Sequence, residues 1–180
     1  SDFSGLGAEA LSVTGTPAAT DLIALLIDTA LDISVAGITK VSGTASNLDL
    51  VVGNTRFTDW ATSNPTLEVT GTSASADDIS ALITSFNSAG YTGDTANKID
   101  AVGLTFTGTA DNVLTVLTSA VVLEDADPAV TLSDATINAA TLILVKAETS
   151  SVDVSTATTV SGLADDVNTV LAVSYVTGLG

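Results

Sequence analysis

The sequence predicts an α/β fold, and within that class a β/α solenoid of about six stacked strand–turn–helix repeats of about 27 residues. Three observations support this expectation. A β-branched or aromatic residue recurs two places before a glycine, four times in a Gly-Thr pair and a fifth time, imperfectly, in Gly162-Leu163. The glycines of this phrase are 28, 28, 37 and 54 residues apart. Apolar residues alternate before each glycine, as in a strand, and take helical spacing after it. Residues 109–117 also align with residues 163–171, with apolar residues at the same offsets from glycine.

The Gly-Thr pairs are expected to form the corners where strands turn into helices. Glycine relieves the backbone at a sharp turn, and threonine can then cap the N-terminus of the helix. The residues assigned to these turns and caps are Gly15, Thr16, Gly43, Thr44, Gly71, Thr72, Gly108, Thr109 and Gly162. Neither G-x-x-x-x-G-K-[ST] nor G-x-G-x-x-G occurs in the sequence, so a structural role is favoured over phosphate binding.

The first unit shows both patterns in order. Leu11 and Val13 alternate with polar residues and predict a half-buried strand. Thr16 is the expected helix N-cap, and Pro17 suits the first helical turn. The apolar run at residues 22–27 then predicts a helix that is mostly buried.

Later units repeat this layout with variations. In the third unit, Thr72, Ser73 or Ser75 is the expected cap of a helix over residues 79–86. Even-numbered units carry a second strand-like element upstream, at residues 31–34, 99–102 and 152–155. The approximate units of a single repeat domain spanning 1–180 are residues 8–30, 31–63, 64–96, 97–126, 127–150 and 151–180. A compact α/β domain with an internal duplication is the competing fold.

The charge balance argues against two classes of partner. The chain has 21 acidic residues against four basic ones, and a formal net charge of −17. Nucleic-acid binding requires Lys and Arg to neutralise phosphates, and anionic membrane surfaces repel such a chain. No apolar stretch approaches the length of a membrane span, so we expect neither nucleic-acid binding nor membrane insertion.

The composition also argues against an enzyme. The chain contains no His and no Cys, which removes the commonest general base and the thiol nucleophile. Neither G-x-S-x-G nor S-x-x-K occurs. Because the chain also lacks Met, we expect it to be a processed product or a segment of a longer polypeptide.

One acidic cluster is a candidate metal site. Glu124, Asp125 and Asp127 lie close together just before a proline. Calcium prefers carboxylate and carbonyl oxygens, so Ca²⁺ is the candidate cation. The alternative is a solvated turn without a cofactor.

Two stretches outside the repeat pattern are candidate binding surfaces. Arg56, Phe57 and Trp60 concentrate aromatic and basic side chains, and Tyr91 lies in the other insertion. Insertions in repeat proteins often carry binding, so these four residues predict a surface for a glycan or a protein partner. The alternative is a packing or edge-capping role.

The segment from Val152 to Gly162, followed by Ala164 to Val167, resembles repeats in very large secreted bacterial surface proteins. Cyanobacterial and other marine adhesin-like or surface-layer proteins are the group concerned. The resemblance lies in composition and rhythm and runs through nearly all of the chain. It implies an extracellular, calcium-rich setting and a role in spacing or assembly, and it transfers no catalytic residue.

These observations together predict a non-enzymatic structural repeat segment of an extracellular surface, adhesin, surface-layer or filament-forming protein. Its expected partners are further copies of itself or neighbouring repeats of the same polypeptide. The alternative hypothesis is a glycan- or protein-binding module that uses the insertions near Trp60 and Tyr91.

Overall fold

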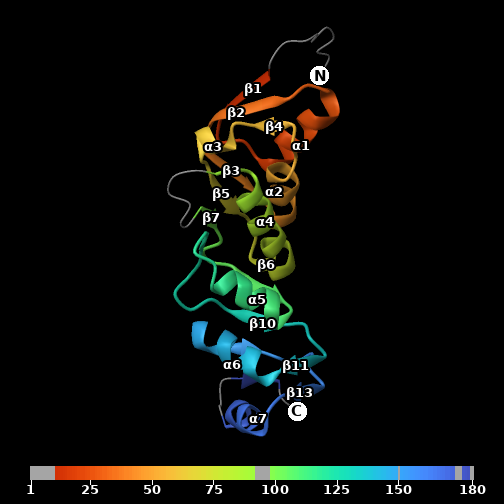
Figure 1. Ribbon diagram of the computed structural model, residues 1–180, viewed down its shortest axis with the longest axis vertical. Helices are drawn as coiled ribbons and strands as arrows, with labels where there is room; N and C mark the ends of the chain where they lie inside the picture. The colour runs from red at the N-terminus through yellow and green to blue at the C-terminus, as the bar shows by residue number, and fades with distance from the viewer. Residues whose placement is uncertain (1–10, 92–97, 150, 173–175, 179–180) are drawn as a thin grey trace.

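The computed structural model describes residues 11–91, 98–149, 151–172 and 176–178. Over these residues the chain forms an elongated α/β structure, with the N-terminal elements at one end and the C-terminal elements at the other (Figure 1). Every strand pair is parallel, and no sheet of the described strands closes into a barrel. The α/β prediction is therefore confirmed.

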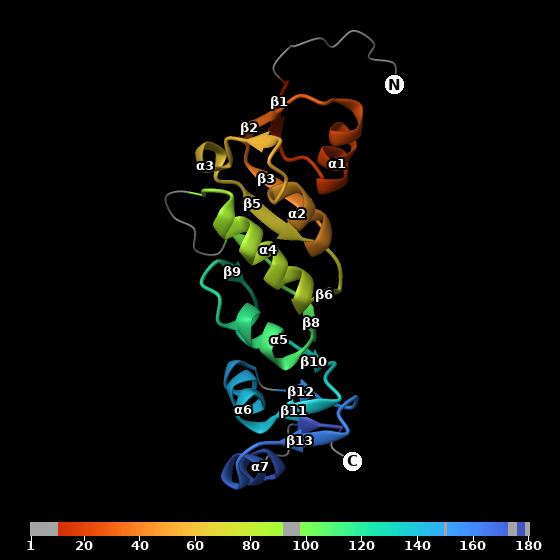
Figure 2. The ribbon, with the colours of Figure 1, turned by 45° about the vertical axis from the view of Figure 1, so that its right-hand side comes forward.

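Seven helices lie within the described ranges. They are α1 (Ala19–Asp28), α2 (Ala45–Val52), α3 (Trp60–Ser63), α4 (Ala76–Ser88), α5 (Ala110–Leu117), α6 (Ala139–Glu148) and α7 (Ala164–Leu171). Without the four-residue α3, the helices form a series in which neighbours pack against each other, in the order α1, α2, α4, α5, α6, α7. Figure 2 shows the later members of this series following one another along the long axis. We call each long helix, with the strands before it, a β/α segment.

The strands form four parallel sheets that overlap along the molecule. The first sheet contains β1 (Leu11–Gly15), β2 (Ile33–Ile38) and β4 (Phe57–Thr58). The second contains β3 (Lys40–Gly43), β5 (Thr66–Val69), β7 (Ile99–Asp100) and β9 (Val122–Leu123). The third contains β6 (Ser73–Ser75), β8 (Thr105–Gly108), β10 (Val130–Leu132), β12 (Val152–Asp153) and β14 (Val176–Thr177), and the fourth β11 (Thr136–Asn138) and β13 (Thr159–Ser161).

The strand register aligns apolar residues of successive segments. In the second sheet, Leu67 lies between Val41 and Ile99, and Ile99 in turn pairs with Val122. All four side chains are buried. The parallel ladder thus carries one apolar row from segment to segment, and the buried side chains of all segments form a single hydrophobic cluster.

The helix caps agree with the sequence prediction at Thr44 and Thr109 and differ from it at Thr16 and Thr72. Thr44 and Thr109 accept hydrogen bonds from the backbone N–H of the third helical residue, as an N-cap does. Thr16 does not cap α1, because Ala18 pairs with Ser42 in a parallel bridge and the helix begins only at Ala19. The prediction for Thr16 was therefore wrong.

Thr72 is also not a cap. After Gly71 the chain forms the short strand β6, which pairs with β8, and α4 begins only at Ala76. Ser75, one of the three expected candidates, caps that helix by accepting from the Asp78 N–H. Leu163 stands at the N-cap of α7 without a side-chain hydrogen bond.

Three glycines owe their position to close packing. A β-carbon at position 43 would lie 2.8 Å from the Ala19 β-carbon, and one at position 108 would lie 3.1 Å from that of Ala76. At position 162 the corresponding distance to Ala139 is 3.2 Å. Each of these glycines therefore lets its strand approach the first residue of the preceding long helix.

The first helix is less buried than its apolar run predicted. Leu22 is completely buried, but Ile27 is 83% exposed, and residues 23, 25 and 26 are half-buried. Among the described helices of this series, α1 packs against α2 alone, whereas α2, α4, α5 and α6 each pack against two.

Candidate functional site

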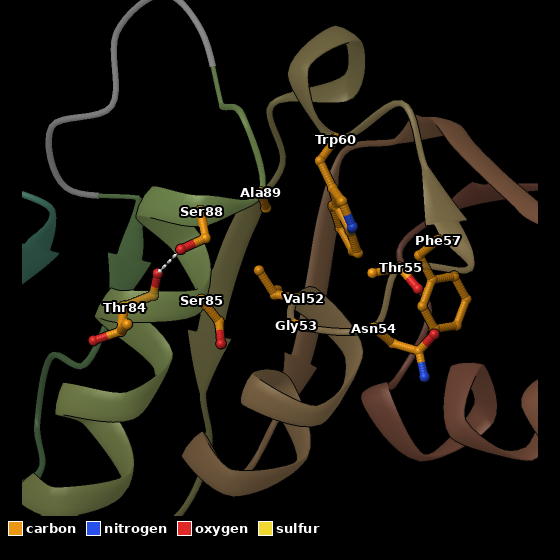
Figure 3. Close-up of a pocket in the computed structure, with 10 residues that line it drawn as sticks. All are labelled: Val52, Gly53, Asn54, Thr55, Phe57, Trp60, Thr84, Ser85, Ser88 and Ala89. Carbon is orange, nitrogen blue, oxygen red and sulfur yellow. Dashed lines mark hydrogen bonds between the residues drawn. The ribbon is translucent and has the colours of Figure 1, made fainter.

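A cleft of about 410 Å³ lies where the C-terminal ends of α2 and α4 face Phe57 of β4 and Trp60 of α3 (Figure 3). Ser85 and Ser88 line it from α4, and Trp60 lines it from α3. The remaining lining residues are Val52, Gly53, Asn54, Thr55, Phe57, Thr84 and Ala89. Two of the four residues predicted as a ligand surface, Phe57 and Trp60, therefore line this cleft, and Tyr91 stacks on Trp60.

The aromatic residues of the two insertions pack on one another. The Trp60 ring stacks on Tyr91 with centroids 6.0 Å apart and meets the edge of Phe57 at 6.2 Å. Tyr91 also contacts Phe86 of α4, at 4.0 Å. Phe57 and Trp60 are only 4% and 3% exposed, so they form a small aromatic core rather than an open stacking platform.

This aromatic core contains polar atoms without hydrogen-bond partners among the described residues. The Trp60 Nε1–H and the Tyr91 hydroxyl are both buried in this way. Burial raises the pKa of the Tyr91 hydroxyl well above its ordinary value, so Tyr91 is neutral in the folded protein. The alternative expectation was a packing or edge-capping role, and its packing part describes the contacts of Phe57, Trp60 and Tyr91.

The wall of the cleft on α4 is polar and uncharged. The Ser85 hydroxyl donates to the Asp49 carboxylate of α2 at 2.6 Å, and the Ser88 hydroxyl donates to the Thr84 carbonyl at 2.9 Å. Asn54 lies opposite, at the end of α2. Hydroxyl and amide groups beside apolar surface suit a neutral, hydroxyl-rich molecule better than a charged one.

Arg56 is used within the fold. Its guanidinium donates to the carbonyls of Leu26, Thr29 and Leu31, at and just beyond the C-terminal end of α1. The last carbonyls of a helix have no partner within the helix, so Arg56 satisfies groups that burial would otherwise leave unpaired. It therefore does not present its charge to a ligand.

The other three basic residues are also engaged. Lys40 pairs with Glu68 at 3.0 Å, Lys98 donates to the Asn64 carbonyl at 3.2 Å, and Lys146 donates to the Thr149 carbonyl. Three of the four cations, including Arg56, thus connect one β/α segment to another. The basic residues join parts of the scaffold and form no patch for phosphates.

The structure does not gather the predicted metal ligands. The Asp125 carboxylate accepts from the Gly103 N–H at 2.8 Å, whereas Asp127 faces the Thr149 hydroxyl at 3.4 Å. Burial, and then the charges of Glu148 and Asp125, raise the pKa of Glu124 to about 7. Within the described part of the chain, no three acidic side chains are placed to hold a metal. Calcium binding stays a prediction.

A second feature, which the sequence did not reveal, connects the first turns of successive helices. The Asn112 amide of α5 donates to Asp77 of α4 at 2.7 Å, and the Thr141 hydroxyl of α6 donates to Asp111 of α5 at 3.4 Å. In both pairs the second residue of one helix accepts from the third residue of the next. A further contact reaches the start of α5 from the loop between β10 and β11, where the Asp134 carboxylate accepts from the Ala110 N–H at 2.7 Å.

The last helix exposes positions that α5 buries. Leu117 at the end of α5 is 7% exposed, whereas Leu171 at the matching position of α7 is 64% exposed. The first residue of α5, Ala110, is buried and the first residue of α7, Ala164, is exposed. The side of α7 away from α6 is therefore apolar and open to solvent.

Comparisons of this chain with protein families, with curated proteins and with solved structures found no match. Among the helices of the described ranges, none has both the length and the apolar character of a membrane-spanning segment.

Proposed function

We propose that this chain is a non-enzymatic structural segment of an extracellular surface or adhesin-like protein, in which the six β/α segments are the coils of a solenoid. One observation carries the proposal: the long helices pack in chain order, and the strand registers connect each segment to the next. Contacts between neighbours along a single axis are the property that distinguishes solenoids from compact domains. A chain of this kind supplies length and spacing.

The surface chemistry fits a spacer. The net charge of −17 keeps neighbouring molecules apart, and three of the four basic residues are occupied by contacts between segments. Threonine hydroxyls in the strands and turns donate to backbone carbonyls of the preceding segment, as Thr156 does to Leu132 and Thr158 does to Ala135. The Thr-rich composition thus serves the stacking itself.

The extracellular setting is supported by the resemblance in rhythm and composition to large secreted bacterial surface proteins. Protease treatment of intact cells that produce the protein tests this part of the proposal. We expect peptides from this chain to be released before lysis, together with those of a known surface protein as a control. Release only after lysis would contradict an extracellular location.

The cleft lined by Trp60, Ser85 and Ser88 supports a second candidate function, the binding of a neutral glycan. Its volume of about 410 Å³ lies in the range of small-ligand sites, and its α4 wall presents hydroxyl groups. Because Trp60 is buried, its removal would damage the fold, so Ser88→Trp is the better test. Ser88 is exposed and lines the cleft, so a bulky side chain at this position should fill it.

Isothermal titration calorimetry with mono- and disaccharides measures this binding. We expect Ser88→Trp to abolish it and Asn87→Trp to retain it, since Asn87 is an exposed residue of α4 outside the cleft. The absence of any saccharide response in the unmodified chain would remove this candidate and leave the structural proposal intact.

A further inference from the structure

The last helix, α7, leaves exposed a side whose counterpart in α5 is covered. The two helices share an apolar residue at the first, fourth, seventh and eighth positions, from Ala110 and Ala164 at the start to Leu117 and Leu171 at the end. They differ at the fifth position, where α5 has Leu114 and α7 has Asn168. In α5 the shared positions are buried between α4 and α6, both of which pack against it. In α7 only Val170 is buried, on a helix that packs against α6.

We propose, building on the solenoid proposed above, that this side of α7 binds a further β/α coil of the type formed by residues 130–148. The interface is already present once in the molecule, where the segment of β10, β11 and α6 covers α5. There Thr141 donates to Asp111, and Asp134 accepts from the Ala110 N–H. Asp165 and the backbone N–H of Ala164 occupy the matching positions on α7.

The chain already continues in the direction that such a coil requires. Strand β14 adds to β12 with Val176 opposite Val152, as β12 adds to β10 with Val152 opposite Val130. Val176 is thus the counterpart of Val130, two segments later. A continuation like residues 132–148 would then place a new helix on α7 as α6 is placed on α5.

Charge favours this coil over the N-terminal end of a second copy as the occupant of the exposed side of α7. The third residue of α6 is Thr141, a hydrogen-bond donor to an aspartate, whereas the third residue of α1 is Asp21. A second copy docked through α1 in this register would bring Asp21 against Asp165, and close like charges are unfavourable. The surface therefore selects a coil with a donor at this position.

An extended variant tests the inference directly. A copy of residues 132–148 replaces residues 178–180, and hydrogen exchange of the α7 amides is measured in both chains. We expect exchange of these amides to slow by at least about tenfold in the extended chain, because docking protects a terminal helix from local opening. Circular dichroism should show added helix. Unchanged α7 exchange, with the appended residues unstructured, would overturn the inference.

Leu171→Asp supplies the matched control. Leu171 is 64% exposed in the unextended chain, so the substitution should leave its stability nearly unchanged there. In the extended chain the same position becomes interior, and Leu171→Asp should remove the gain in α7 protection. Equal protection with and without Leu171→Asp would show that the appended helix does not dock on this surface.

Two further measurements distinguish the possible occupants of this surface and test the solenoid itself. Sedimentation of the unextended chain across a dilution series should show a monomer, and self-association abolished by Leu171→Asp would identify a second copy as the occupant instead. Exchange in α2, α4 and α5 tests the underlying solenoid independently. If these inner helices are protected and α7 does not respond to the extension, only the docking inference fails.

Discussion

Small residues set how closely successive β/α segments approach. Each of the six long helices begins with alanine, and the first five of these alanines are buried. Gly43, Gly108 and Gly162 each face the alanine that begins the preceding long helix. The strand can lie against the helix terminus only because neither residue carries more than a methyl group. Tight packing of this kind leaves no room for one more carbon.

Gly43→Ala tests this contact. The added β-carbon would lie 2.8 Å from that of Ala19, so we expect the free energy of unfolding to fall by about 1–3 kcal/mol in urea denaturation. The double variant with Ala19→Gly removes the clash and should be less destabilised than the sum of the two single variants. Strict additivity of the two effects would contradict a direct contact.

The raised pKa of Glu124 predicts that the free energy of unfolding depends on pH. Its pKa rises from 4.5 to about 7 on folding, so between these values the folded state binds more protons than the unfolded state. Its contribution therefore lowers stability as the pH rises from about 4.5 to 7. Glu124→Gln removes this loss, and because the side chain is half-exposed we expect a gain on the order of 1 kcal/mol above pH 7.

Urea denaturation of both proteins across this pH range measures the difference. Glu148→Gln should give part of the same gain, since the charge of Glu148 is the second cause of the shift. Parallel stability curves for the unmodified protein and Glu124→Gln would contradict the raised pKa.

At the scale of elements, polar contacts fix which helix follows which. The apolar faces of the helices are similar to one another, so burial alone would accept several neighbours. Hydrogen bonds between the second residue of one helix and the third residue of the next distinguish them, as in the Asp77–Asn112 pair. Alignment of strand registers adds a second constraint, because a slip of one residue would turn apolar side chains outward.

Asn112→Asp tests the helix-to-helix contact. It replaces a donor 2.7 Å from Asp77 with a like charge, and we expect a loss of about 1 kcal/mol in the free energy of unfolding. The exchanged pair, Asp77→Asn with Asn112→Asp, restores a donor and an acceptor and should recover most of the loss. Failure of the exchange to recover stability would show that Asp77 and Asn112 do not interact in solution.

The sequence predicted well the features that depend on adjacent residues, and predicted poorly those that depend on contacts between segments. Thr44 and Thr109 cap helices as expected, because a cap depends on a few adjacent residues. Thr16 and Thr72 do not, because strand pairing with another segment keeps the chain extended beyond them. That pairing depends on residues far along the chain, which a local pattern does not contain.

The candidate site shows the same division. The insertions were identified as departures from the repeat, but the inward packing of Trp60 on Tyr91 depends on how two segments meet. A signal for the interfaces was present in the sequence, in the alanine that begins each long helix. These residues are Ala19, Ala45, Ala76, Ala110, Ala139 and Ala164. This recurrence of alanine is less conspicuous in the sequence than the Gly-Thr pairs.

At the scale of the whole molecule, the account depends on segments that lie along one axis and share one apolar interior. The single cluster of buried residues runs from Ala19 in α1 to Val170 in α7. Such a chain gains stability as neighbours are added, and its ends are its least stable parts. The half-exposed apolar residues of α1 and the open side of α7 fit this expectation.

Small-angle X-ray scattering of the chain tests this central claim most directly. A compact domain of 180 residues has a radius of gyration of about 16 Å. We expect a clearly larger value, with a distance distribution skewed toward long distances, at salt concentrations that screen repulsion between molecules. A value of about 16 Å with a symmetric distribution would contradict the stacked arrangement.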